Sequence, residues 1–372
     1  MKVLYDDQIF SLQKFGGISK YFSEIYKRGN LNSDFLFILS ILISENINIK
    51  SLPNTFNFNT FQDVEFKGKL KVSSSVNRLC SVINILSKNY DIFHPTYYNS
   101  YFISILFGKP YVLTVHDTTH EKLTKLFPTL RSDKFSFDKR LIIEMATIII
   151  SVSQTTKNDI IEFYNIDPSK IIVVPLASSL RKDFGTDISK PFNFNIQNDF
   201  LLYVGVRRIY KNFDFFLKSI KNILLKTDGL VLVCAGGNSF TTEEIENINN
   251  LGLSAKIIHQ CINNQTLIEL YSKAIAFVFP SLNEGFGIPV IEAMENLCPC
   301  VLSDRGSLPE IAEDCAIYFD PTNSFSIESQ IEKILNNKDL RKKLISSGLL
   351  KSKDFSWNKT FSKTMDVYKS IL

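Results

Sequence analysis

Two hydrophobic patterns alternate along most of the chain. Short, nearly continuous apolar runs are typical of strands buried on both faces of a parallel sheet. Between them, apolar residues recur at the three- and four-residue spacing of an amphipathic helix. In the first half, the apolar runs predict strands at residues 2–5, 35–43, 91–93, 111–115, 147–152 and 171–174. This alternation predicts a doubly wound α/β domain.

The alternation stops between Ala177 and Asp199, where Ser, Lys, Asp, Asn and Pro191 replace the periodic pattern, as is typical of a linker. It then restarts, with strands predicted at residues 200–204, 230–234, 256–258 and 274–279. We therefore predict two Rossmann-like α/β domains. The first covers residues 1–180 and the second residues 199–352, with a linker over residues 181–198.

Two helices of the first domain are predicted from their apolar spacing. One follows Gly16-Gly17 and continues through Tyr26, with Ser19 or a neighbour as its N-cap. The other spans residues 72–87 and carries an apolar stripe through Val76, Leu79, Ile83 and Leu86. Between them, residues 54–66 are rich in Asn and Phe without a clear period, which predicts a loop or irregular excursion.

The strand ending at Phe279 is followed by a stretch that suits a sugar nucleotide. Gly285 and Gly287 allow a sharp turn and a close approach of the backbone to a ligand, and Pro289 suits the first turn of a helix. N–H groups at a helix start bind phosphates. The carboxylates Glu284 and Glu292 bracket that start and suit sugar and ribose hydroxyls. A purely structural strand–loop–helix connection explains this stretch equally well when it is taken alone.

Three other stretches follow predicted strands, at the edge where α/β sheets bind ligands. The loop from Gly205 to Asn212 contains Arg207, Arg208 and Lys211, and fixed cations there would neutralise a leaving diphosphate. Gly16-Gly17 occupies the matching place in the first domain, and His116-Asp117 follows the strand at residues 111–115. A basic surface loop and an ordinary Gly-Gly turn are the alternative interpretations.

Composition narrows the class of protein. The chain has 372 residues, 45% of them hydrophobic, and a net charge of +4, which does not indicate nucleic-acid binding. Six cysteines without a C-x-x-C pair indicate reduced thiols in a cytoplasmic protein. A signal-peptide pattern, a bilayer-spanning apolar segment, a P-loop, an H-E-x-x-H motif and metal-ligand spacing are all absent from the sequence. We expect a cytoplasmic enzyme without a metal.

Taken together and in order, these stretches resemble the retaining GT-B glycosyltransferases of family four (glycosyltransferase group 1), among them bacterial mannosyl- and rhamnosyltransferases of surface polysaccharide synthesis. The matching stretches are Gly16 to Phe22, Thr114 to Asp117, Tyr203 to Asn212, and Glu284 to Glu292 with seven residues between the two glutamates. The resemblance implies two facing Rossmann-like domains. It also implies that residues 353–372, which end in a helix after Trp357, return to the first domain.

The resemblance also implies roles for individual residues. His116, Glu284, Arg207 and Lys211 would be catalytic. Gly17, Phe286, Gly287, Ile288 and Glu292 would bind the donor. Because Val206 stands where the family often has arginine directly after the glycine, the choice between Arg207 and Arg208 as the phosphate contact stays open.

The implied reaction is transfer of a hexose from a nucleoside-diphosphate sugar to a saccharide or lipid-linked acceptor, with retention and without a metal or cofactor. GDP-mannose or a GDP-deoxyhexose is favoured as donor, and UDP sugars stay open. The alternatives are an epimerase or phosphorylase of the same fold, or a non-catalytic sugar-nucleotide-binding partner. Residues 121–140 mix basic and apolar side chains, which suits either a peripheral contact with the cytoplasmic face of the inner membrane or an ordinary solvated helix.

Overall fold

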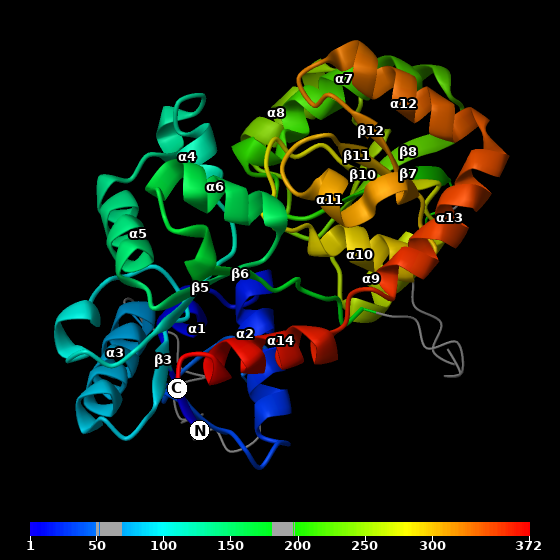
Figure 1. Cartoon of the computed structure of the whole chain (residues 1–372). Helices are drawn as coiled ribbons and strands as arrows, with labels where there is room; N and C mark the ends of the chain where they lie inside the picture. The colour runs from blue at the N-terminus through cyan, green and yellow to red at the C-terminus, as the bar shows by residue number, and fades with distance from the viewer. Residues whose placement is uncertain (50–51, 53–68, 181–195, 197) are drawn as a thin grey trace. The chain divides into compact units, whose positions relative to one another are not determined.

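The computed structural model describes residues 1–49, 52, 69–180, 196 and 198–372 (Figure 1). The chain divides into two compact units. Unit 1 comprises Met1–Leu176 and Trp357–Leu372, and unit 2 comprises Ala177–Ser356. The irregular excursion predicted over residues 54–66, and nearly all of the linker predicted over residues 181–198, lie outside the described residues.

Unit 1 contains two three-stranded parallel sheets, in the orders β2-β1-β3 and β4-β5-β6. A parallel bridge between Phe93 and Tyr111 links them. Their strands are β1 (Lys2–Tyr5), β2 (Leu36–Leu39), β3 (Ile92–His94), β4 (Val112–Val115), β5 (Ile148–Ser151) and β6 (Ile171–Val173). Each strand predicted in this half is therefore present. The strand predicted over residues 35–43 is shorter, because β2 pairs with β1 and its last paired residue is Leu39, opposite Tyr5.

Seven α-helices of unit 1 surround these sheets in the described part of the chain. They are α1 (Gln8–Leu12), α2 (Gly17–Gly29), α3 (Lys69–Ser87), α4 (Thr119–Leu123), α5 (Asp133–Met145), α6 (Gln154–Tyr164) and α14 (Trp357–Lys369). The last one returns from the end of the chain and packs against α2. Its Tyr368 hydroxyl is buried 2.6 Å from His94 Nδ1 and 3.0 Å from the Tyr5 hydroxyl. These contacts anchor α14 in unit 1, as the resemblance implies.

The start of α2 differs from the prediction. Gly16 is the N-cap and no side chain caps the helix, so Ser19 as the N-cap is wrong. Ser19 lies inside the first turn, where its hydroxyl donates to the carbonyl of Gly16 at 3.1 Å. A Cβ at Gly16 would lie 1.8 Å from Gln13 Oε1, so the flexible Gln13 side chain would have to move to admit a larger residue here.

Unit 2 is built on one six-stranded parallel sheet, in the order β12-β11-β10-β7-β8-β9. Its strands are β7 (Asp199–Val204), β8 (Leu230–Ala235), β9 (Ile257–Gln260), β10 (Ala276–Phe279), β11 (Cys300–Ser303) and β12 (Ala316–Phe319). Its helices are α7 (Phe213–Lys226), α8 (Thr242–Asn250), α9 (Asn264–Lys273), α10 (Ile288–Glu295), α11 (Leu308–Ala312), α12 (Ser324–Asn336) and α13 (Lys338–Ser352). The strands predicted at residues 200–204 and 274–279 are β7 and β10.

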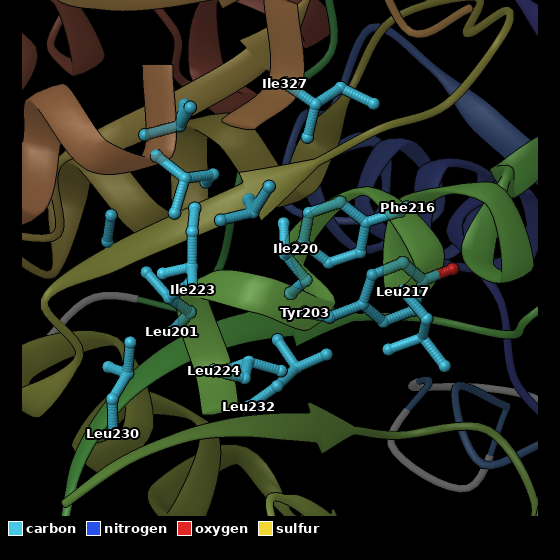
Figure 2. Close-up of a cluster of buried hydrophobic side chains, with 14 of the residues drawn as sticks. Leu201, Tyr203, Phe216, Leu217, Ile220, Ile223, Leu224, Leu230, Leu232 and Ile327 are labelled. Carbon is cyan, nitrogen blue, oxygen red and sulfur yellow. The ribbon is translucent and has the colours of Figure 1, made fainter. Parts of the chain in front are cut away.

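A buried apolar cluster fixes α7 and α12 on one face of this sheet. Figure 2 shows Leu201 and Tyr203 of β7 among Phe216 and Ile220 of α7, with Ile327 of α12 nearby. Each of these side chains is fully buried, so the cluster stabilises the strand that leads into the basic loop.

Candidate functional site

The order of the strands brings two of the predicted stretches together. β10 and β8 pair with β7 on opposite sides, so the chain reverses its direction across the sheet at β7. Open α/β sheets bind ligands at such a switch point, outside the carboxyl ends of the strands. The loops that follow β7 and β10 are joined there by a hydrogen bond from the Leu282 amide to the Tyr210 carbonyl, at 2.8 Å.

Lys211 and Glu284 meet at this edge. The Lys211 ammonium lies 2.5 Å from Glu284 Oε1, and about 15% of each side chain is exposed. Lys211 Nζ also lies 4.7 Å from the centre of the Phe279 ring, at the end of β10. The pair combines a fixed cation with a carboxylate in a partly desolvated place, where a charge interacts more strongly than in bulk water.

The loop that carries Glu284 is braced by residues that the sequence analysis missed. The Ser307 hydroxyl donates to the carbonyls of Glu284 and Phe286, at 3.0 and 2.8 Å. Gly306 has a φ of +63°, and a Cβ there would lie 2.7 Å from the Glu284 backbone. The signal available in the sequence was a Gly-Ser pair separated from the end of β11 by two residues. These contacts position Glu284 without touching its carboxylate.

The three residues predicted to offer amides lie at the start of α10. Gly287 is the N-cap with a φ of +101°, a conformation that favours glycine, and Ile288 is the first helical residue. A Cβ at Gly287 would also meet the Leu308 side chain at 2.9 Å. Phe286 is buried and packs edge-on against Phe355. The positive end of the α10 dipole therefore follows directly after the loop of Glu284.

Glu292 lies farther along α10, partly buried, and accepts a hydrogen bond from the Tyr271 hydroxyl at 3.2 Å. Burial raises the pKa of Glu292 to about 7, since an ionised carboxylate loses hydration there. The Tyr271 hydrogen bond opposes this shift, and the charge of Glu295 adds to it. Glu292 is thus a carboxyl group that changes its charge near neutral pH.

Arg207 is held differently from Lys211. Its Nε and Nη2 donate to the two carboxylate oxygens of Glu244, at 2.8 and 3.2 Å, and Nη2 also donates to the carbonyl of Asn238 at 2.7 Å. The guanidinium lies 4.6 Å from the centre of the Phe240 ring, and 5% of the side chain is exposed. Nη1 is buried and has no partner within the described ranges. Arg208, in contrast, is exposed.

The remaining predicted residues, Gly17 and His116, belong to unit 1. His116 follows β4, and its ring packs edge-on against Tyr21 of α2 with 5.3 Å between ring centres. Because Gly17 lies one turn before Tyr21, the glycine loop and the histidine are brought to the same edge of unit 1. Burial lowers the pKa of His116 to about 4, so the imidazole is neutral at pH 7. Its Nε2 has no partner in the part of the chain that the structure describes.

Within the described ranges, no helix is long and apolar enough to cross a bilayer. Nor does that part of the chain gather three or more His, Cys, Asp or Glu side chains that could hold a metal ion. Metal independence stays a prediction.

Comparison with known proteins supports the same family in both halves of the chain. A family model described as glycosyl transferases group 1 matches residues 184–350, and one described as glycosyltransferase family 4 matches residues 61–178. The O-antigen chain mannosyltransferase RfbU of Salmonella typhimurium is 32% identical over 224 residues, which are 60% of this chain and 60% of that protein. The O-antigen chain mannosyltransferase B of Escherichia coli is 26% identical over 270 residues, or 70% of each chain.

The solved structures agree on the fold. HepE of Anabaena, solved in complex with UDP and glucose, superposes over the full length of both chains with a TM-score of 0.74 at 16% identity. At that identity the likeness concerns the fold, which is the GT-B arrangement of two α/β domains. With a matching model for each half and mannosyltransferases among its relatives, the chain belongs to the GT-B glycosyltransferases of group 1 and family 4.

Proposed function

We propose that this glycosyltransferase transfers a hexose from a nucleoside-diphosphate sugar to a saccharide or lipid-linked saccharide, with retention of the anomeric configuration. The observation that carries the proposal is the Lys211–Glu284 pair at the carboxyl ends of β7 and β10. The Lys211 ammonium suits a diphosphate, and the Glu284 carboxylate suits sugar hydroxyls. Both relatives described above are named mannosyltransferases, which supports mannose as the hexose and GDP-mannose as the donor.

In this proposal the donor separates the ion pair. The diphosphate takes Lys211 as its counterion, and Glu284 accepts hydrogen bonds from hydroxyls of the sugar. Lys211 then stabilises the charge that develops on the diphosphate as the glycosidic bond breaks. The acceptor attacks from the same face, which retains the configuration without a carboxylate nucleophile. The amides of Phe286, Gly287 and Ile288 bind the sugar and phosphate, and Glu292 accepts hydrogen bonds from the ribose.

The remaining predicted roles are part of the same proposal. Arg207 contributes Nη1, the N–H group that Glu244 and the Asn238 carbonyl leave without a partner, to a phosphate. Arg208 is the alternative phosphate contact because its side chain is exposed. His116 contacts the donor sugar as a neutral hydrogen-bonding group, and Gly17 lies against the diphosphate or the acceptor. Neither a metal nor another cofactor takes part.

Residues 121–140 have fewer free cations for binding an anionic membrane than their sequence alone suggests. Four of the six cations in the stretch at residues 121–140 are already engaged in ion pairs. Lys139 is buried against Glu121, and the other pairs are Lys122–Asp159, Arg131–Asp133 and Arg140–Glu144. Leu126 and Phe137 are exposed. We propose that this stretch is at most a weak peripheral site at the cytoplasmic face of the inner membrane, which flotation with anionic vesicles would measure.

The proposed reaction is tested with purified protein, a panel of GDP, UDP, ADP and dTDP sugars, and saccharide acceptors. We expect transfer from GDP-mannose, an α-linked product by NMR, and unchanged turnover in EDTA. Slow hydrolysis of the donor without an acceptor would still support donor activation. An epimerised sugar nucleotide in place of a glycoside would point to an epimerase. Nucleotide binding without any turnover would point to a non-catalytic partner, and either result would overturn the proposal.

A further inference from the structure

The helix α3 of unit 1 exposes the apolar stripe that its sequence carries. An amphipathic helix on the surface of a globular protein normally buries this stripe. Here Val72, Leu79, Ile83 and Leu86 are 50%, 60%, 57% and 47% exposed, and Val76, between the first two, is partly exposed. Figure 1 shows α3 along the outer side of unit 1, away from α14. Clustered exposed aliphatic side chains of this kind mark an interaction surface.

The orientation of α3 is fixed by polar contacts on its inner face. Asn77 accepts from the amides of Leu42 and Ile43, at 2.9 and 3.0 Å, and donates to the Ile43 carbonyl at 2.6 Å. One turn later, the Ser81 hydroxyl donates to Asp7 at 2.9 Å. Rotating the stripe inward would break these hydrogen bonds and leave the amides of Leu42 and Ile43 without these partners.

The spacing of the exposed stripe matches a coiled-coil seam. Its members follow one another at intervals of four, three, four and three residues, which is the period of a heptad with two apolar positions. Val76 and Ile83 then occupy the a positions, and Val72, Leu79 and Leu86 the d positions. β-Branched residues at a with leucine at d favour a parallel pair of helices. The flanking e and g positions are small or uncharged: Ser73, Ser75, Cys80, Val82 and Ser87.

We propose that α3 pairs with α3 of a second copy of this chain as a short parallel coiled coil, so that the enzyme is a homodimer. A two-fold axis places the same stripe opposite itself, and a pattern that is apolar at both a and d is complementary to itself. The uncharged flanks allow the two copies to approach without like-charge repulsion.

A lipid bilayer is a poorer fit to the same surface. A membrane-binding helix normally carries Lys or Arg on its polar face, available to anionic lipids. Within α3, Lys69 pairs with Glu45 at 2.8 Å and Arg78 with Asp7 at 3.3 Å. Among the described residues, Lys71 is the one cation of this helix without an ion pair. The charge of the helix is thus turned towards unit 1, while the apolar seam is turned outward.

The proposal is tested by sedimentation velocity on the full chain across the micromolar range. We expect the wild type to be a dimer. Leu79→Glu places a charge in the seam of both copies and should weaken the dimer at least about a hundredfold. Leu350→Glu, at a 65% exposed position of α13, is the matched control and should leave the dimer intact. A monomeric wild type, or a dimer that Leu79→Glu does not weaken, would overturn the proposal.

A cysteine pair tests the parallel arrangement. In a parallel coil the d positions of the two copies face each other, so Leu79→Cys should form an intermolecular disulfide under mild oxidation. Ser74→Cys, on the face of α3 opposite the seam, should not. The wild type controls for the native cysteines. Thermal stabilisation by GDP should be the same in Leu79→Glu as in the wild type, so failure of the dimer and failure of the donor site are distinguishable. A monomer that floats with anionic vesicles would assign the stripe to a membrane instead.

Discussion

Unit 2 contains two ion pairs of similar chemistry that join the loop after β7 to the first turn of α8 and to the loop after β10. Arg207 and Glu244 form a bidentate pair enclosed by Phe240 and the Asn238 carbonyl, whereas Lys211 and Glu284 share one short contact. Arginine uses its planar fork to hold a carboxylate in one geometry, while lysine acts as a point charge on a flexible stem. We expect the Arg207–Glu244 pair, which has several hydrogen bonds, to stabilise the loop, and the Lys211–Glu284 pair, which has one hydrogen bond, to exchange partners with a substrate.

The two glutamates, Glu244 and Glu284, also differ in where they lie in unit 2. Glu244 completes the N-terminal capping box of α8 with Thr241, so its carboxylate stabilises the start of that helix. Glu284 lies in a loop whose backbone accepts a hydrogen bond from Ser307, and its carboxylate caps no helix in the described part of the chain. Substitutions at the four residues should therefore separate turnover from stability.

The largest effect on turnover is expected for Glu284→Ala. This variant removes the acceptor of the sugar hydroxyls and should lower kcat by about a thousandfold or more, by analogy with the loss of a preorganised polar group. Its melting temperature should stay within a few degrees, because a loop side chain is lost and the Ser307 contacts remain. Glu284→Gln keeps the shape and tests the charge alone. Turnover within tenfold of the wild type in the alanine variant would remove Glu284 from the site.

A smaller loss is expected for Lys211→Ala. If Lys211 stabilises the departing diphosphate, kcat should fall by about ten- to a thousandfold while the KM for the donor changes less. Lys211→Arg should recover part of the loss, because it restores the charge with a different geometry. The matched comparison is Arg208→Ala. If kcat falls more in that variant than in Lys211→Ala, the role belongs to Arg208.

Substitution in the Arg207–Glu244 pair should mainly change the free energy of unfolding. Glu244→Gln leaves Arg207 without its carboxylate and should lower the free energy of unfolding by about 2 kcal/mol. Its effect on turnover should stay below about tenfold. Glu243→Gln, the exposed neighbour in α8, is the control and should change the denaturant midpoint little. A normal denaturant midpoint together with a large loss of turnover would show that Glu244 acts at the site through Arg207.

Sequence reasoning identified the Lys211–Glu284 edge because strand order in a doubly wound sheet follows general rules. Loops after strands that are distant in the sequence meet at one edge, so separate motifs could be placed together. It did not find Gly306 and Ser307, because bracing of one loop by another depends on the local backbone path. Nor did it find the pairing of Arg207 with Glu244, two residues separated by the helix α7 and the strand β8.

The hydrophobic period of α3 also could not predict how the helix is oriented on unit 1. An apolar stripe predicts which residues share a face, and it does not predict where that face points. Asn77 decides the orientation through hydrogen bonds to Leu42 and Ile43, which are more than thirty positions earlier in the chain. The face that carries Asn77 therefore lies against unit 1, although the aliphatic stripe is on another face of the same helix.

The smallest effect, and the one that distinguishes the carboxylates most finely, is the pH dependence of donor binding. The pKa of Glu292 is raised to about 7, so its carboxyl group is mostly protonated at pH 6 and mostly ionised at pH 8. An ionised carboxylate accepts hydrogen bonds from both ribose hydroxyls, whereas the protonated form also carries a donor proton.

The affinity for the nucleoside diphosphate should therefore rise about five- to tenfold from pH 6 to pH 8, as measured by calorimetric titration. Glu292→Gln should bind more weakly and lose this dependence, because its amide does not titrate. Since the second ionisation of a terminal phosphate also falls near pH 6, the intact sugar nucleotide, which lacks that ionisation, is the decisive ligand. A pH profile shared by wild type and Glu292→Gln with this ligand would place the titrating group elsewhere and leave Glu292 as a structural partner of Tyr271.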